Sequence, residues 1–137
     1  MPDLTITPAS VVSGASPQMG AGIAGETLTA GQAVYKKSTD GKIYKAKCGG
    51  TPEEAGILGI LLNGASVNQP VDYQSDGIVV LGGSTTVKTT TYVLSAAYGG
   101  ICPQADLIAT QRLVYVGFAR DLAGTFQLMR NNTGVTL

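Results

Sequence analysis

The stretch GAGIAGETLTAG at residues 20–31 contains the Gly-x-Gly-x-x-Gly spacing that can bind the pyrophosphate of a dinucleotide. That chemistry requires a strand before the glycines and a helix directly after them, because the phosphate binds the free amides of the first helical turn. Pro17 stands close before Gly20, and Gly31 would end any helix after one turn. We therefore interpret these glycines as turn residues and predict no cofactor site.

The groups that most enzymes use for catalysis are also missing. The sequence contains no histidine, which removes the commonest general base and metal ligand and every Ser-His or Cys-His nucleophile pair. Glu53 and Glu54 follow Pro52, where acidic residues complement the start of a helix, so we interpret them as capping residues. Four aspartates beside turns or small residues lack the spacing of a calcium loop: Asp72, Asp76, Asp106 and Asp121. The sequence therefore predicts neither enzymatic activity nor a metal site.

One predicted hairpin is basic. Tyr35 and Tyr44 are interleaved with five lysines, Lys36, Lys37, Lys42, Lys45 and Lys47. This pattern could bind a phosphate backbone and stack bases. However, 9 basic and 9 acidic residues give the whole chain no net charge, so no broad positive field would attract nucleic acid. We favour a solvated strand face whose lysines protect a sheet edge, and we predict no nucleic-acid partner.

The two cysteines, Cys48 and Cys102, show no CxxC or metal-ligand spacing. The N-terminal MPDLTITPAS lacks the basic start and apolar core of a signal peptide, and no apolar run reaches the roughly 18 residues of a membrane span. We therefore expect synthesis in the cytoplasm and no membrane partner. That reducing compartment favours two free thiols, and a disulfide between them is the alternative.

The elements that would position these residues are short β-type runs separated by turn residues, such as GETLTAGQAVYKK, GKIYKAK, GILGILL and GIVVL. Asp40-Gly41 predicts a hairpin with a type I′ turn, which requires positive φ at both central residues. The only helix candidates are two short segments, 51–56 and 103–111. We predict an all-β fold, a small barrel or sandwich of short strands.

The second half of the chain resembles the first. VYKKSTDGKIYKA aligns with YVLSAAYGGICPQA, and ILGILL aligns with YVGFAR, which places Gly59 over Gly117. This similarity predicts two similar β modules with pseudo-repeats at about 31–62 and 89–120. Chance similarity within a chain rich in glycine and valine is the alternative.

Residues 1–22 are broken by proline and glycine, and we predict an extended N-terminal arm there, followed by a β domain over 23–137. The arm contains short apolar pairs: Leu4, Ile6, Val11 and Val12. These side chains would either contact a partner or pack on their own domain as an extra strand. Charged residues make up only 13% of the chain, against about a quarter in typical soluble domains. A surface with so few charges favours extensive contact with other chains.

The run AGETLTAGQAVYKKSTDGKIYKAK, followed by TPEEAGILGILLNGASVNQPVDYQSDGIVVL, resembles the small capsid decoration proteins of tailed bacteriophages, also called cement or head-stabilising proteins. In that family a glycine turn and hairpin lead to an apolar Ile-Leu-Gly-Ile strand and then to a Gln-Pro-Val turn. The segments 31–35, 57–60 and 69–71 match this pattern. The sequence from Tyr92 onward is similar to the ends of such proteins, so the resemblance covers most of 24–137.

The resemblance implies a structural protein on the outer surface of a phage head. It implies a homotrimer at three-fold and quasi-three-fold positions that binds the major capsid protein, stabilises the shell and is found in the virion. Leu4, Ile6, Val11 and Val12 would then be capsid or subunit contacts. One alternative is a phage tail or fibre-attachment protein. Another is a carbohydrate-binding β module, although such modules usually present exposed aromatic rings and this chain has no Trp, two Phe and six Tyr.

Overall fold

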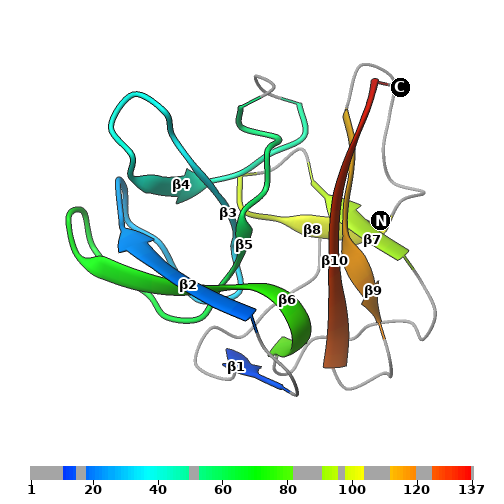
Figure 1. The fold of residues 1–137 in the computed structure, drawn as a ribbon, viewed down its shortest axis with the longest axis horizontal. Coiled ribbons are helices and arrows are strands. Elements are labelled where there is room, and N and C mark those ends of the chain that lie inside the picture. Colours follow the sequence, from blue (N-terminus) through cyan, green and yellow to red (C-terminus); the bar gives the residue numbers. More distant parts are fainter. Residues whose placement is uncertain are drawn as a thin grey trace.

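In a computed structural model of the chain, the residues that the structure describes are 11–14, 18–49, 53–81, 91–95, 98–103, 112–119 and 125–136. These residues form ten β-strands and no helix, which confirms the predicted all-β fold (Figure 1). The strands are β1 (Val11–Ser13), β2 (Gln18–Ile23), β3 (Ala33–Lys36), β4 (Ile43–Lys45), β5 (Gly59–Leu61), β6 (Pro70–Leu81), β7 (Thr91–Leu94), β8 (Ile101–Pro103), β9 (Arg112–Ala119) and β10 (Thr125–Thr136).

The strands form one curled antiparallel sheet with the order β4-β3-β5-β6-β10-β9-β7-β8. β6 has 12 residues, so different parts of it pair with different strands. Its first part pairs with β5 and β2, and its last part pairs with β10 and β1. Gly77, which has a φ of 88°, lies between the two parts, where glycine tolerates a conformation that other residues avoid.

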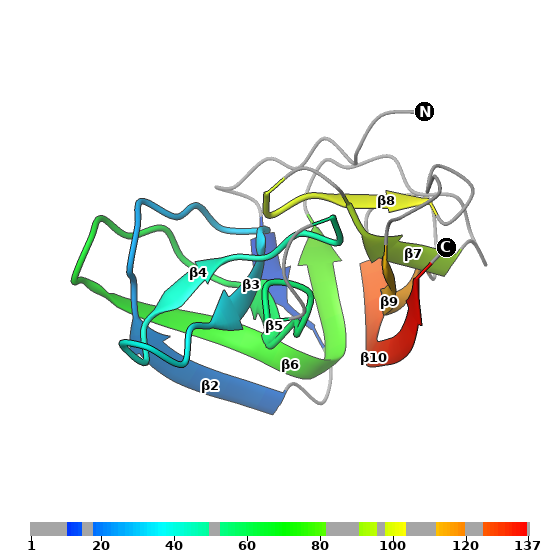
Figure 2. The same cartoon turned by 90° about the horizontal axis from the view of Figure 1, so that it is seen from above.

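The two halves of the sheet contain the same succession of strand pairs. In the first half the β3–β4 hairpin is followed by β5, which returns beside β3; in the second the β7–β8 hairpin is followed by β9, which returns beside β7. Val34 pairs with Gly59 as Tyr92 pairs with Gly117. We call β2 to β5 with the first part of β6 module 1, and β7 to β10 with β1 and the last part of β6 module 2. Figures 1 and 2 show β2, β3 and β4 at one side of the molecule and β7, β9 and β10 at the other, with β6 running between them.

The hydrophobic core has two parts because alternate residues of β3 face different sides. Val34 points into module 1, whose interior is closed where Ala24 forms a bridge with Ile43 of β4. Ala33 and Tyr35 point the other way, into a larger cluster that also contains buried residues of module 2. The module 2 members of this larger cluster include Tyr92, Leu94, Phe126 and Leu128. The modules therefore share one core and do not form separate domains.

The hairpin predicted at Asp40-Gly41 is present, but its predicted turn type is wrong. Gly41 has a φ of 71°, whereas Asp40 has no positive φ, so the turn cannot be type I′. The amide of Lys37 donates to the carbonyl of Lys42, and the amide of Gly41 donates to the carbonyl of Lys37, so the loop is longer than two residues. The Asp40 carboxylate stabilises this loop by accepting hydrogen bonds from the Lys42 amide at 2.9 Å and the Tyr44 hydroxyl at 2.6 Å.

The glycines that matched the dinucleotide spacing lie largely in a strand, which corrects their interpretation as turn residues. Gly20 and Gly22 belong to β2, Gly25 follows it, and none of the three has a positive φ. A Cβ atom at each position would collide with a neighbouring side chain: that of Tyr73 at Gly20, that of Ile43 at Gly22 and that of Tyr44 at Gly25. The glycines therefore allow large side chains of other strands to lie directly on the backbone. No helix follows them within the described residues 26–49.

The segment predicted to be an arm, residues 1–22, contributes to the sheet. β1 pairs with the C-terminal end of β6, and β2 pairs with its first part. Ile23, where the predicted β domain begins, is the last residue of β2. Residues 1–10 and 15–17 lie outside the described residues.

Neither helix candidate appears as a helix where the structure describes it. Residues 53–55 form a turn, closed by a hydrogen bond from the Gly56 amide to the Glu53 carbonyl at 3.0 Å. Of the second segment, Pro103 ends β8 and the remainder lies outside the described residues. Within the described part of the chain, no helix has the length and apolar character needed to cross a membrane.

Candidate contact surfaces

The four predicted contact residues fall in two groups. Val11 and Val12 lie in β1 and pair with the end of β6, whereas Leu4 and Ile6 lie outside the described residues. The side chain of Val11 is only 6% exposed and belongs to the larger core cluster. Val11 therefore packs on its own domain, as the alternative interpretation of the arm had it. A contact role for the other three residues stays a prediction.

Glu53 does not cap a helix, contrary to its interpretation from sequence. Its carboxylate instead accepts hydrogen bonds from the Ser38 amide at 3.0 Å and the Ser38 hydroxyl at 2.7 Å. These hydrogen bonds from Ser38 hold the pKa of Glu53 below its ordinary value. Glu53 thus ties the β3–β4 loop to the segment before β5. Among the described residues, no three His, Cys, Asp or Glu side chains lie close enough together to hold a metal ion.

Both cysteines are buried in the core. Cys48 has no exposed surface and Cys102 is 3% exposed, and no disulfide joins them. This arrangement agrees with the preferred prediction of two thiols.

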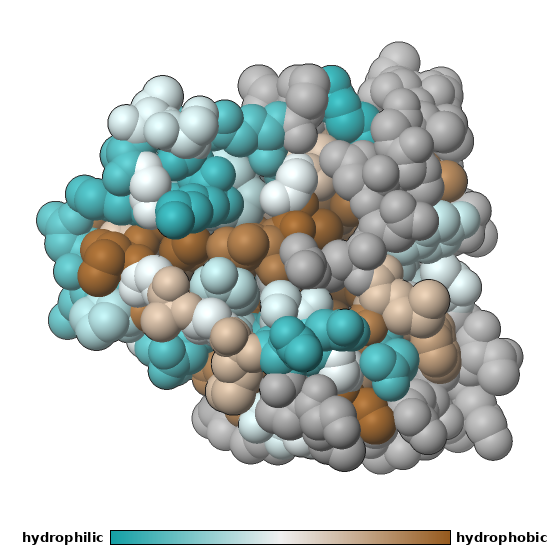
Figure 3. All heavy atoms as spheres, viewed as in Figure 1, coloured by the Kyte–Doolittle hydropathy of each residue, from teal (hydrophilic) through white to brown (hydrophobic). Residues whose placement is uncertain are grey.

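The first exposed apolar surface lies along β2. A Cβ atom at Gly20 or Gly22 would point inward, so the side chains of Met19 and Ile23 point outward on this strand. Met19 is 56% exposed and Ile23 is 41% exposed. Val67, which is 52% exposed, lies near Ile23 because the 66–69 loop is hydrogen bonded to Ala24. We call Met19, Ile23 and Val67 the β2 stripe. Figure 3 shows a band of hydrophobic atoms between the positions of β2 and β4 in module 1.

The backbone of β2 adds to this surface. Among the described residues β2 pairs with β6 only, so it is an edge strand of the sheet there. Edge strands commonly carry lysine or proline, or are very short, which prevents association with other chains. β2 has 6 residues, QMGAGI, and none of them is charged. Charged side chains therefore do not protect this edge, and its pairing with β6 is irregular only between Gln18 and Met19.

The second exposed apolar surface is a groove of about 280 Å³ on module 2. Its lining residues come from β7, β9 and β10: Thr91, Tyr115, Gly117, Phe118 and Met129. Met129 is 57% exposed, so part of the apolar surface of this groove is open to solvent. We call this surface the module 2 groove. Figures 1 and 2 show the strands that line it, β7, β9 and β10, at the other side of the molecule from β2.

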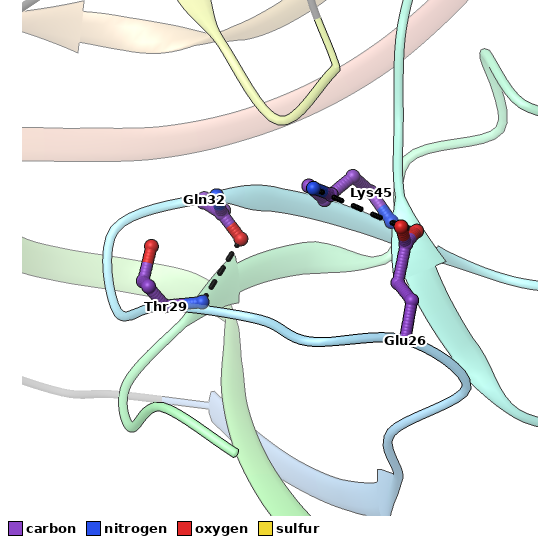
Figure 4. Close-up of polar contacts among 4 residues, drawn as sticks. All are labelled: Glu26, Thr29, Gln32 and Lys45. Atoms are coloured by element: carbon purple, nitrogen blue, oxygen red, sulfur yellow. Dashed lines mark hydrogen bonds and ion pairs between the residues drawn. The ribbon is translucent and has the colours of Figure 1, made fainter. Parts of the chain in front are cut away.

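The lysines of the basic hairpin have local partners. Lys45 pairs with Glu26 at 3.7 Å, and the ammonium of Lys42 donates to the Asn68 side chain at 2.7 Å. Lys37 lies over the ring of Tyr44 at 4.9 Å from its centre. Figure 4 shows that Glu26 comes from the segment after β2 and reaches Lys45 of β4, whose amide also donates to it at 3.0 Å. In the same view Gln32 accepts a hydrogen bond from the Thr29 amide.

A polar hollow of about 350 Å³ lies beside this hairpin. We call it the tyrosine hollow, and its lining residues are Glu26, Tyr35, Lys37, Tyr44, Lys45, Glu54 and Tyr98. Tyr98 reaches it because the turn before β8 docks on module 1, where the amide of Ala33 donates to the carbonyl of Gly99 at 3.0 Å. Tyr35 is only 5% exposed, and burial, followed by the charges of Glu54, Glu53 and Glu26, raises its pKa to about 12.

The raised pKa of Tyr35 predicts a loss of stability in alkali. The phenol ionises near pH 10 in the unfolded chain but only near pH 12 in the folded protein, so the folded state binds more protons in this interval and its stability falls as pH rises from 10 to 12. Below pH 10 the contribution is complete. Chemical unfolding followed at several pH values should show this decline, and Tyr35→Phe should reduce its slope. An unchanged slope in the variant would assign the decline to other groups.

Sequence reasoning did not find these surfaces. Met19 was assigned to the arm and Ile23 to the start of the β domain, and the residues that line the tyrosine hollow come from distant parts of the chain. The alternation of Met19, Ala21 and Ile23 with two glycines was the only local signal for the β2 stripe. No protein-family model matches the chain, and no curated protein matches it significantly.

Proposed function

We propose that this chain is a structural protein that decorates the outer surface of a tailed-bacteriophage head. It binds the major capsid protein, acts as a homotrimer at three-fold and quasi-three-fold positions, and stabilises the assembled shell. The observation that carries this proposal is the presence of two separate exposed apolar surfaces, the β2 stripe on module 1 and the module 2 groove. A protein that joins neighbouring subunits needs at least two such surfaces.

Stabilisation follows from mass action. A protein that binds the assembled shell and not its separated subunits shifts the equilibrium toward the shell. Each apolar contact contributes roughly 25 cal/mol for every Å² removed from water. A trimer multiplies weak contacts, because the first bound subunit holds the other two at high effective concentration. The low charge of the chain, 13% of residues, reduces the cost of burying its surface.

The test is the number of copies of this chain in purified virus particles, measured by quantitative mass spectrometry against the major capsid protein. We expect a ratio close to one copy per capsid subunit. A few copies per particle would instead assign the protein to the tail or a fibre, and complete absence from particles would overturn the structural role.

A further inference from the structure

The tyrosine hollow is separate from the two apolar surfaces that carry the proposed function. It combines aromatic rings with paired charges, and its volume of about 350 Å³ lies within the range of small-molecule sites in proteins. Its chemistry therefore indicates what kind of molecule would bind there.

Among the described residues that line the hollow, the charges balance. Glu26 and Glu54 bring two carboxylates, and Lys37 and Lys45 bring two ammonium groups. An anion would be repelled by the carboxylates and a cation by the ammonium groups, so neither gains a net attraction. A neutral molecule rich in hydroxyl groups can donate hydrogen bonds to the carboxylates and accept them from the ammonium groups at the same time.

Tyr98 supplies an exposed aromatic ring at the edge of the hollow. Its side chain is 52% exposed, and the ammonium of Lys47 lies 4.1 Å from the ring centre. This cation–π contact holds the ring in place from one face. The opposite face carries the negative potential that attracts the C–H groups of a sugar ring.

The inner wall of the hollow is already ordered. The rings of Tyr35 and Tyr44 lie 6.1 Å apart, and the Tyr44 hydroxyl donates to Asp40 at 2.6 Å. Gly25 lies directly beneath the Tyr44 ring, where any larger residue would displace it. A ligand would therefore not need to order these side chains on binding, which lowers the entropic cost of association.

We propose that the tyrosine hollow binds a neutral saccharide of about hexose size, which stacks on Tyr98 and exchanges hydrogen bonds with Glu54, Glu26 and the two lysines. This inference goes beyond the proposed function, because shell decoration requires no small ligand. It assigns the molecule a second binding capacity on a surface that the apolar contacts leave open.

The first experiment compares charged and neutral sugars that share one ring. Saturation-transfer NMR with the full chain would use glucose, galactose and N-acetylglucosamine as neutral probes, and glucuronate and glucosamine as charged probes, each at about 10 mM to detect weak binding. We expect transfer to at least one neutral sugar, with weaker transfer to both charged ones. Absence of transfer to every neutral sugar, or stronger binding of a charged probe, would overturn the proposal.

The second experiment locates the site with matched variants. Tyr98→Ala and Glu54→Gln should each weaken binding of the best neutral sugar at least tenfold, while Tyr115→Ala, which removes a tyrosine from the module 2 groove, should leave it unchanged. Circular dichroism checks that each variant is folded. Binding by Tyr98→Ala and Glu54→Gln as tight as that of the original chain would place the sugar elsewhere. Shell decoration should be unaffected by Tyr98→Ala, so this proposal and the proposed function can fail independently.

Discussion

Replacing Met19 and Ile23 by aspartate should strongly weaken the proposed binding of this protein to phage shells. Both side chains are largely exposed, at 56% and 41%, so the double variant should fold normally. In the decorated shell, however, both carboxylates would be buried without a partner, and leaving a charge unpaired in an interface costs about 2–5 kcal/mol. Since each 1.4 kcal/mol is a factor of ten, we expect affinity to fall by more than about a hundredfold.

The measurement is a titration of undecorated shells with purified protein, with bound and free chains separated by sedimentation. The matched control is the Met19→Leu/Ile23→Val double variant, which keeps the β2 stripe apolar and should bind as the original chain does. Met129→Asp tests the module 2 groove in the same way. Full decoration by the aspartate double variant would remove the β2 stripe from the interface.

Local features of the fold were predictable because the physics that fixes them is local. Asp40-Gly41 required a turn between two β-type runs, whatever the rest of the chain did. The turn type was missed because the loop is longer than two residues, and the Asp40 carboxylate in it accepts a hydrogen bond from the Tyr44 hydroxyl on the following strand.

The role of the glycines in β2 could not be predicted from their spacing. Gly20 and Gly22 are required by the side chains of Tyr73 and Ile43, which come from strands far along the chain. The same limit applies to the tyrosine hollow, where Glu26 follows β2 and Tyr98 precedes β8. Sequence patterns report alternation within one strand, but they do not report which strands become neighbours.

The repeat is the long-range feature that the sequence did contain, because it aligned Gly59 with Gly117. In the structure Gly59 lies against the carbonyl of Gln74, and Gly117 lies against the carbonyl of Gln127. In each module the glycine therefore lets the return strand approach the backbone of the long strand that follows. Because backbone atoms cannot move aside as a flexible side chain can, these positions have no room for a larger residue.

Gly117→Ala should therefore destabilise the protein strongly. A Cβ atom there would collide with the carbonyl oxygen of Gln127 and the ring of Phe126, which is fully buried. Overpacking of this kind costs about 1–3 kcal/mol, and we expect the upper end because the obstacle is backbone. Alanine would otherwise favour a strand over glycine by about 0.5–1 kcal/mol, so the collision acts against a small gain. Thermal unfolding should shift down by roughly 10 °C.

The matched control is Gly49→Ala, because nothing lies within 4 Å of a Cβ atom at that position. Its unfolding temperature should change by no more than about 2 °C. Gly59→Ala provides the decisive comparison, since the same backbone collision in module 1 should cost about as much as Gly117→Ala. If Gly117→Ala matched the control, the close approach of β9 and β10 would be wrong. If Gly59→Ala were as stable as the control and Gly117→Ala were not, the two modules would share a strand order but not the close backbone contact at the aligned glycines.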